Sequence, residues 1–340
     1  MKRRRTAVIA ALTVLILIVF PLGLTVGGVA IPPVDIIGAL SGHAPADSLA
    51  AFIIMDTRLP SLITALLAGA GLSVAGLLMQ TCFNNPLAGP SIMGVSSGAN
   101  LGVALVIMCL GSIAGTAGRL SVMAGAAAGA LAVLSIILIF STVITSADVL
   151  LIVGILIGYL TSSVISLLYY FSSDQGVHSF VVWGLGTFAG VSRSELWLLA
   201  LIVSIMLACA WFYSKSLNAL LLGTRFADNV GVSVNRVRTA LLCLAGILTA
   251  AVTAWCGPIA FIGLIVPHIA RMLLATSNHR PLLPATALCG ALLAMLCQIL
   301  AVAPLAGNTG SIPINAITPV IGVPVIIYVL LNRRRILYFN

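Results

Sequence analysis

The chain has 340 residues, of which 61% are hydrophobic and only 7% are charged, and its mean hydropathy is +1.22. A soluble domain carries about 25% charged residues, so this composition excludes a water-soluble protein and requires a surface that faces lipid. The net charge of +9 does not indicate nucleic-acid binding, because the basic residues follow the pattern of a membrane topology signal.

Ten apolar segments, each long enough to cross a bilayer with about 20 residues, follow one another along the chain. The first begins after the basic residues MKRRR and lacks a convincing cleavage site, so we expect an uncleaved helix and not a signal peptide. The expected spans are 6–30, 57–82, 91–112, 120–141, 147–171, 194–214, 237–255, 258–274, 283–303 and 313–332. The sequence therefore predicts an all-α membrane protein in which residues 1–340 form a single polytopic permease domain.

The charges set the orientation of these spans. With a cytoplasmic N-terminus, thirteen of the 16 Lys and Arg residues fall inside, and only Arg58, Arg119 and Arg193 fall outside. Both ends of the chain are basic, which requires an even number of spans and predicts that both termini are cytoplasmic. No charged residue lies near the middle of an expected span, which argues against a proton-coupled transporter or an ion channel.

The segment that follows the second span, residues 80–102, is rich in turn-forming and small residues. Asn84, Asn85 and Pro86 form a turn signal, and Pro90 and Gly94 follow. Such backbone suits the lining of a cavity or close helix packing, and the alternative is a plain cytoplasmic turn. A looser Pro-then-Gly pattern recurs in residues 257–271, five spans later, as the two halves of an inverted repeat would show.

Three further segments carry specific expectations. Residues 172–193 are apolar but too short to span, so an interfacial or re-entrant piece is expected there. His268, beside Pro267 at an inner helix end, has no second ligand at metal-binding spacing and is expected to be structural, whereas His279 is expected to be solvated in a loop. Residues 215–238 form the longest basic cytoplasmic loop, with short amphipathic helices expected on either side of Gly231, and such a surface suits either a soluble partner or solvent alone.

The chain carries no Walker A, GxSxG or HExxH signature, so it is not expected to be an enzyme, and any ATP hydrolysis must take place on another chain. At this point several motifs together resemble one family. The pieces RLPSLITALLAGAGLSVAGLLMQTCFNNPLAGPSIMGVSSGANLG (58–102), LGTRFADNVGVSVNRVR (222–238) and GPIAFIGLIVPHIARMLL (257–274) are similar to permease subunits of type II ABC importers for iron-siderophore, haem and vitamin B12.

The resemblance implies a bacterial inner-membrane homodimer with the pathway at its two-fold axis, two cytoplasmic ATPase subunits that bind ATP and magnesium, an external substrate-binding protein, and no cofactor on this chain. It also implies roles for particular residues. The cytoplasmic loop is expected to seat on the ATPases through Arg225, Phe226, Asp228, Asn229, Gly231 and Arg236. The inner gate is expected at Asn85, Pro86 and Leu87 and at the pair Thr145 and Ser146, and Arg58 is expected to contact the binding protein.

The chain departs from the family pattern at three positions. Ser61 stands where a second arginine is usual, and Ser311 and Asn315 replace the ends of a Glu-Leu-Pro-Ile-Gly motif, which leaves the docking details open. The expected cargo is an iron chelate, either a siderophore or haem. The alternatives are vitamin B12 carried by the same architecture, a zinc or manganese ABC permease, and a secondary transporter that needs no ATPase.

Overall fold

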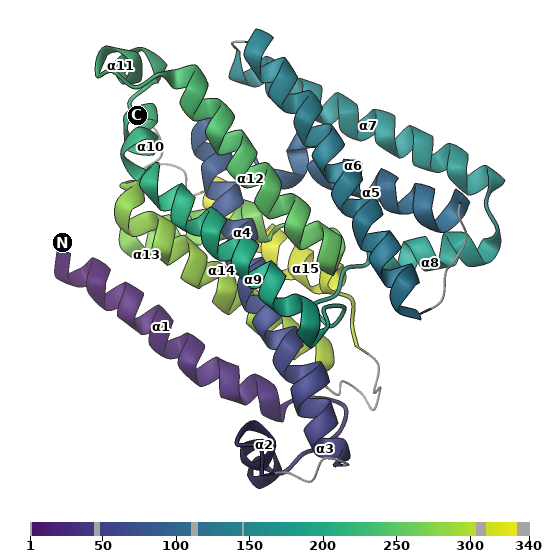
Figure 1. The fold of residues 1–340 in the computed structure, drawn as a ribbon. Helices are drawn as coiled ribbons and strands as arrows, with labels where there is room; N and C mark the ends of the chain where they lie inside the picture. Colours follow the sequence, from purple (N-terminus) through teal and green to yellow (C-terminus); the bar gives the residue numbers. More distant parts are fainter. Residues whose placement is uncertain (1, 44–47, 110–114, 145, 304–310, 332–340) are drawn as a thin grey trace.

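The computed structural model describes residues 2–43, 48–109, 115–144, 146–303 and 311–331, and all regular structure in these residues is helical. Figure 1 shows the long helices packed side by side with short helices at their ends. The elements are α1 (Lys2–Thr25), α2 (Pro33–Leu40), α3 (Leu49–Phe52), η1 (Ile53–Arg58), α4 (Leu59–Cys82), η2 (Pro90–Met93), α5 (Val95–Ala104), η3 (Leu105–Cys109), α6 (Gly115–Val143), α7 (Ala147–Phe171), α8 (Asp174–Gly184), α9 (Arg193–Phe212), α10 (Ser214–Leu221), α11 (Thr224–Asn229), α12 (Val234–Cys256), α13 (Ile262–Leu274), α14 (His279–Val302) and α15 (Ile314–Leu331).

Among the described residues, seven helices are long and apolar enough to cross a membrane, and three shorter apolar helices accompany them. The seven lie in α1, α3–α4, α6, α7, α9, α12 and α14, and the shorter ones are Val95–Cys109, Ile262–Leu274 and Ile314–Tyr328. Each of the ten expected spans therefore overlaps one of these helices. The expected span 258–274 was too long, because Gly257 and Phe261 have positive φ angles of 74° and 69° and helix α13 begins only at Ile262.

Helix α4 lies at the centre of the bundle. It contacts α9, α12, α13 and α14, and Figure 1 shows it surrounded by other helices. Most of its side chains are buried. Helices α1 and α7, by contrast, leave most of their side chains exposed, and α9 leaves half of them exposed, which suits helices that face lipid or another subunit.

Glycine determines how closely the central helices approach. A Cβ atom on Gly76 of α4 would collide with the carbonyl oxygen of Gly263 of α13. Helices α5 and α6 cross where two glycines of each helix meet: Gly98 faces Gly129, and Gly102 faces Gly125. A Cβ atom on any of these glycines would collide with the backbone of the glycine opposite. Small residues spaced four apart allow such close contact between membrane helices.

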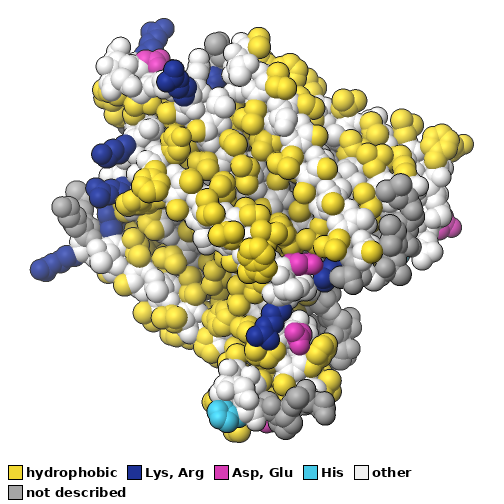
Figure 2. Space-filling model, viewed as in Figure 1, with side chains coloured by type: hydrophobic (Ala, Val, Ile, Leu, Met, Phe, Trp, Pro, Cys, Tyr) yellow, Lys and Arg dark blue, Asp and Glu magenta, His cyan; other side chains and the backbone are white. Residues whose placement is uncertain are grey.

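Basic side chains gather at one end of the bundle. Figure 2 shows them along the edge formed by α10, α11 and the N-terminal end of α1, next to a broad hydrophobic band. The exposed members of this set are Arg3, Arg4, Lys215, Arg225, Arg236 and Arg280. We call this end the inner end, and the end that carries α2, α3 and α8 the outer end.

The outer end also holds the one ion pair among the described residues, in which Arg119 Nη2 lies 2.9 Å from Glu195 Oε1. The segment 172–193, expected to be interfacial, contains helix α8, which has 11 residues and is too short to span a bilayer.

Candidate functional site

The expected coupling loop, residues 215–238, is divided into three parts at the inner end. Helix α10 takes its first part, α11 its middle, and the first turn of α12 its end. Gly223 and Gly231, with φ angles of 101° and 84°, flank α11 and its C-cap Val230, and this left-handed backbone is readily adopted only by glycine. The expected short helix is present before Gly231, as α11, whereas the helix after Gly231 is the long α12.

Helix α11 presents a mixed charged and apolar surface. Within it only Ala227 is buried. Phe226 and Val230 are 45% and 55% exposed, and the remaining residues expected to contact the ATPase are also exposed: Arg225, Asp228, Asn229, Gly231 and Arg236. An exposed aromatic ring among charges is a typical element of a protein interface.

The turn at Asn85–Leu87 leads from the inner end of α4 to η2. Asn84 adopts a left-handed φ of 47°, and Asn85 Oδ1 accepts a 2.9 Å hydrogen bond from the backbone nitrogen of Leu87. The carbonyl oxygen of Pro86 accepts a 2.9 Å hydrogen bond from Nε2 of His268 on α13. The turn is thus held both by its own asparagine and by a side chain from the other half of the protein.

The second expected gate segment lies between α6 and α7. Thr145 lies outside the described residues. Ser146 is the N-cap of α7 and is exposed, and its hydroxyl accepts a hydrogen bond from the backbone nitrogen of Val149. Arg238, at the start of α12 directly after the coupling loop, donates a 3.3 Å hydrogen bond from Nη1 to the carbonyl oxygen of Ile144. Arg238 was expected in the cytoplasmic loop, but it is only 6% exposed, because it folds onto the α6–α7 connection.

Buried polar residues at the inner ends of α4, α13 and α14 were not identified as functional from the sequence. Gln80, Thr81, His268, Arg271 and His279 are each at most 4% exposed. The expectation of a solvated His279 is wrong, because this residue begins α14 and its ring lies between α10 and α4. One feature of the sequence could have indicated this cluster, namely the polar pair Gln80–Thr81 at the end of an apolar helix, because polar residues in membrane segments face the bundle interior.

Arg58, expected to contact a binding protein, lies at the outer end but is only 7% exposed. Its guanidinium donates to the carbonyl oxygens of Leu24 (2.7 Å), Thr25 (3.2 Å) and Val29. These bonds tie the end of α1 to the start of α4. The contact with a binding protein therefore remains a prediction. In the observed geometry, the guanidinium of Arg58 stabilises the packing of α1 against α4.

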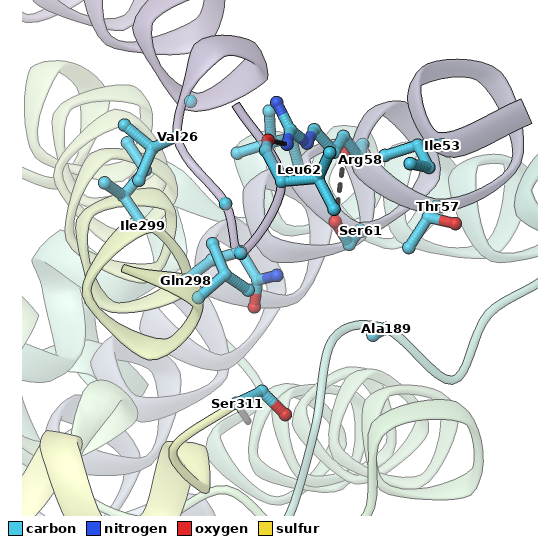
Figure 3. Close-up of a pocket in the computed structure, with 15 residues that line it drawn as sticks. Val26, Ile53, Thr57, Arg58, Ser61, Leu62, Ala189, Gln298, Ile299 and Ser311 are labelled. Atoms are coloured by element: carbon cyan, nitrogen blue, oxygen red, sulfur yellow. Dashed lines mark hydrogen bonds between the residues drawn. The ribbon is translucent and has the colours of Figure 1, made fainter. Parts of the chain in front are cut away.

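Arg58 also lines a cavity of about 240 Å³ that we call the outer pocket. Figure 3 shows Arg58, Ser61 and Leu62 on one side of this space, Val26, Gln298 and Ile299 on another, and Ala189 and Ser311 across from them. Gln298 is only 4% exposed. Two of the three departures from the family pattern, Ser61 and Ser311, are 250 positions apart in sequence and meet in this one cavity.

The third departure, Asn315, joins three segments at the outer end. Its Oδ1 accepts from the backbone nitrogen of Ala260 (3.1 Å), and its Nδ2 donates to the carbonyl oxygens of Gly184 (3.1 Å) and Pro258 (2.6 Å). Glycine at this position would make none of these side-chain bonds. Within the described part of the chain, no group of three or more His, Cys, Asp or Glu residues is placed to hold a metal ion.

The bundle, its apolar surface and its basic inner end define a polytopic α-helical membrane protein. The chain belongs to the FecCD transport family, whose model matches residues 15–332. It is 35% identical to the vitamin B12 import system permease protein BtuC of Citrobacter koseri over 98% of this chain and 97% of that protein. BtuC of Salmonella typhi is 36% identical over 86% of this chain and 88% of that protein.

The fold agrees with the same assignment. A solved structure titled as an inward-facing conformation of a metal-chelate type ABC transporter superposes with a TM-score of 0.82 at 28% identity, over 96% of this chain and 99% of that one. The protein is therefore a permease subunit of a type II ABC importer and is not itself an ATPase. ATP is hydrolysed by a partner subunit.

Proposed function

We propose that two copies of this chain form a homodimer and that an organic metal chelate passes between them, with helix α7 lining the pathway. The observation that carries the proposal is a set of exposed hydroxyl groups on α7. Ser162, Ser163 and Ser166 are exposed in the second half of this apolar helix. Hydroxyl side chains at membrane depth favour helix interfaces and water-lined cavities over lipid.

The neighbours of α7 support the same arrangement. Helix α7 packs against α5 and η2 on one side, and Ser97 of α5 lies opposite Gly158. The bulky exposed residues Leu156, Tyr159 and Leu160 provide apolar surface for a second copy. A pathway of hydroxyls and apolar side chains holds a whole chelate weakly, so that the chelate can leave on the inner side.

At the inner end, we assign α11 as the surface that seats on the partner ATPase. The exposed Phe226 supplies an apolar anchor, and Arg225 and Asp228 supply charges of both signs beside it. The gate lies at the turn Asn85–Leu87 and at Thr145–Ser146. The basic residues at this end support a cytoplasmic position for it and for both termini.

At the outer end, an external binding protein delivers the chelate. The outer pocket lies among the loops that such a protein would meet, and it is lined by apolar groups with a few polar ones, as recognition pockets usually are. The cargo we propose first is an iron chelate, a siderophore or haem. Vitamin B12 is the second candidate, because the relatives from Citrobacter koseri and Salmonella typhi are named as vitamin B12 permeases.

The experiment that tests the assembly is purification of the tagged chain from its native membrane, with identification of the proteins that accompany it. We expect an ATPase in equal number to the permease, and we expect its loss when Phe226 is changed to Asp. Arg193→Asp, a charge change at an exposed residue of the outer end, is the control and should retain the ATPase. A chain that purifies alone and still transports would contradict the proposal.

A second experiment assigns the cargo. The binding protein that accompanies the complex is titrated with ferric siderophores, haem and cyanocobalamin, and each bound ligand is then offered for uptake. Uptake of an iron chelate supports the first candidate, and uptake of cobalamin alone supports the second. Uptake of free zinc or manganese in place of any chelate would contradict both.

A further inference from the structure

Polar side chains at the inner end, most of them buried, form a chain of interactions between four helices, in two hydrogen-bonded parts that are joined by the backbone between Thr81 and Gln80. Its side chains lie on α10, α4, α13 and α14. Asn218 falls within the expected coupling loop 215–238, and none of the other side chains belongs to the expected coupling or gate residues. Polar groups in a membrane bundle are costly unless they are hydrogen-bonded. A connected set of this kind therefore fixes the relative positions of the helices that carry it.

The first part of the chain joins α10 to α4 through one imidazole. Oδ1 of Asn218 accepts from the backbone nitrogen of His279 (2.8 Å) and from its Nδ1 (2.9 Å). An amide oxygen only accepts, so Nδ1 carries the proton and Nε2 is left as an acceptor 2.9 Å from the Thr81 hydroxyl. The single hydrogen of this hydroxyl has a second acceptor 3.0 Å away, the carbonyl oxygen of Leu77 in its own helix. Nδ2 of Asn218 donates to Oδ1 of Asn278 (3.0 Å), the N-cap of α14.

The second part of the chain joins α4 to the turn at Asn85–Leu87. Gln80, next to Thr81, accepts a 2.7 Å hydrogen bond from Arg271 Nη1 and donates a 3.0 Å bond to the carbonyl oxygen of Leu264. His268 lies one helical turn after Leu264 on α13 and donates to the carbonyl oxygen of Pro86. The turn is thereby linked to α13 and α4, and through His279 to α10.

Helix α10 connects this chain of bonds to the helix that we assign to the ATPase. Helix α10 contacts α11, the surface assigned to the ATPase, and it also contacts α4 and α14. A displacement of α11 moves α10, and the bonds Asn218–His279–Thr81 pass that displacement to the inner end of α4. The turn at Asn85–Leu87 begins three residues after that end.

We propose that Asn218, His279 and Thr81 are positioning residues that couple movement of the ATPase-facing helices to the gate turn. This inference rests on the proposed function, because coupling requires an ATPase. Breaking the link leaves ATP hydrolysis intact but separates it from transport. A coupling free energy of the usual size corresponds to a change of about tenfold.

The test uses the reconstituted complex with its binding protein and compares Thr81→Val with Thr81→Ser. The valine variant keeps the shape but removes the hydroxyl, whereas the serine variant keeps the hydroxyl. The matched control is Thr249→Val in α12, because Thr249 is only 2% exposed and bonds only its own helix, at Ala245. Asn218→Ala, at a half-buried position on a surface helix, breaks the same link without altering the core.

We expect Thr81→Val and Asn218→Ala each to lower substrate uptake per ATP hydrolysed by about tenfold, with ATPase activity within about twofold of the parent. The double variant should lose no more than either single one, because both break one link. Thr81→Ser and Thr249→Val should behave as the parent protein. Equal loss of uptake and ATPase activity, or no loss of uptake per ATP, would overturn the inference. A parent complex that hydrolyses no ATP would instead overturn the proposed function.

Discussion

Arg58 Nη1 donates a 2.7 Å hydrogen bond to the backbone carbonyl oxygen of Leu24, which lies 34 residues earlier in the chain. Further bonds to Thr25 and Val29 complete the set. The single charge at the start of α4 is therefore used to fasten α1 and the loop that follows it. A planar guanidinium can bond several carbonyl groups at once, whereas an ammonium group is a compact point charge.

Replacing Arg58 by Lys should therefore lower stability. We expect a loss of about 2 kcal/mol, because hydrogen bonds to charged groups contribute about 1.5–3 kcal/mol. The measurement is thermal unfolding of the purified protein in detergent, with Arg193→Lys at an exposed outer site as the control. An unchanged unfolding temperature together with weaker affinity for the binding protein would show that Arg58 serves docking instead.

The contact between Gly76 and Gly263 predicts an intolerant position. Gly76→Ala places a methyl group against the backbone of α13 and should destabilise the protein by about 1–3 kcal/mol. Gly38→Ala is the matched control, since nothing lies within 4 Å of a Cβ at that position. Folded yield and unfolding temperature measure both variants. Equal behaviour of the two would show that α4 and α13 separate more easily than their packing indicates.

The exposed serines of α7 predict a selective transport defect. Ser162→Leu adds bulk and removes a hydroxyl from the proposed pathway, so uptake should fall by about tenfold or more while assembly with the ATPase is retained. Ser135→Leu on α6 is the control, because Ser135 is also exposed and bonds only its own helix at Leu131. If the two variants transport equally well, α7 faces lipid and not the pathway.

The outer pocket predicts a site at which docking of the binding protein can be blocked. Ala189 is exposed and lines the cavity, so Ala189→Trp fills the opening without disturbing buried residues. We expect affinity for the binding protein to fall by about tenfold, which corresponds to 1.4 kcal/mol. Val181→Trp, at an exposed residue of α8 outside the cavity, should leave affinity unchanged. Unaltered affinity of the Ala189 variant would remove the outer pocket from the docking surface.

The sequence predicted the order and approximate bounds of the apolar segments well, because hydropathy and the distribution of basic residues act over whole segments. Seven of the ten expected spans correspond to helices long enough to cross a membrane, and three correspond to shorter apolar helices. The expected span 147–171 coincides with α7. The expected span that contains α13 began too early. The sequence does not indicate that Phe261 has a positive φ angle, because phenylalanine rarely adopts this conformation. Such a conformation is imposed by packing between distant segments.

Individual side-chain roles were harder to predict. The isolated sequence gives no indication that Arg58 bonds the end of α1, or that His279 lies between α10 and α4. Both depend on contacts between residues far apart in the chain. The exposure of Arg225, Phe226 and Asp228, by contrast, follows from a short amphipathic segment between two glycines and could be predicted locally.

The central claim, that the chain is the membrane subunit of an ATP-driven chelate importer, is tested most directly by uptake into proteoliposomes. The chain is reconstituted with its ATPase, and the loaded binding protein is added outside. We expect chelate accumulation that requires ATP, the ATPase and the binding protein together. Accumulation by this chain alone, without ATP or with an ion gradient in its place, would show that the chain is not a subunit of an ATP-driven importer.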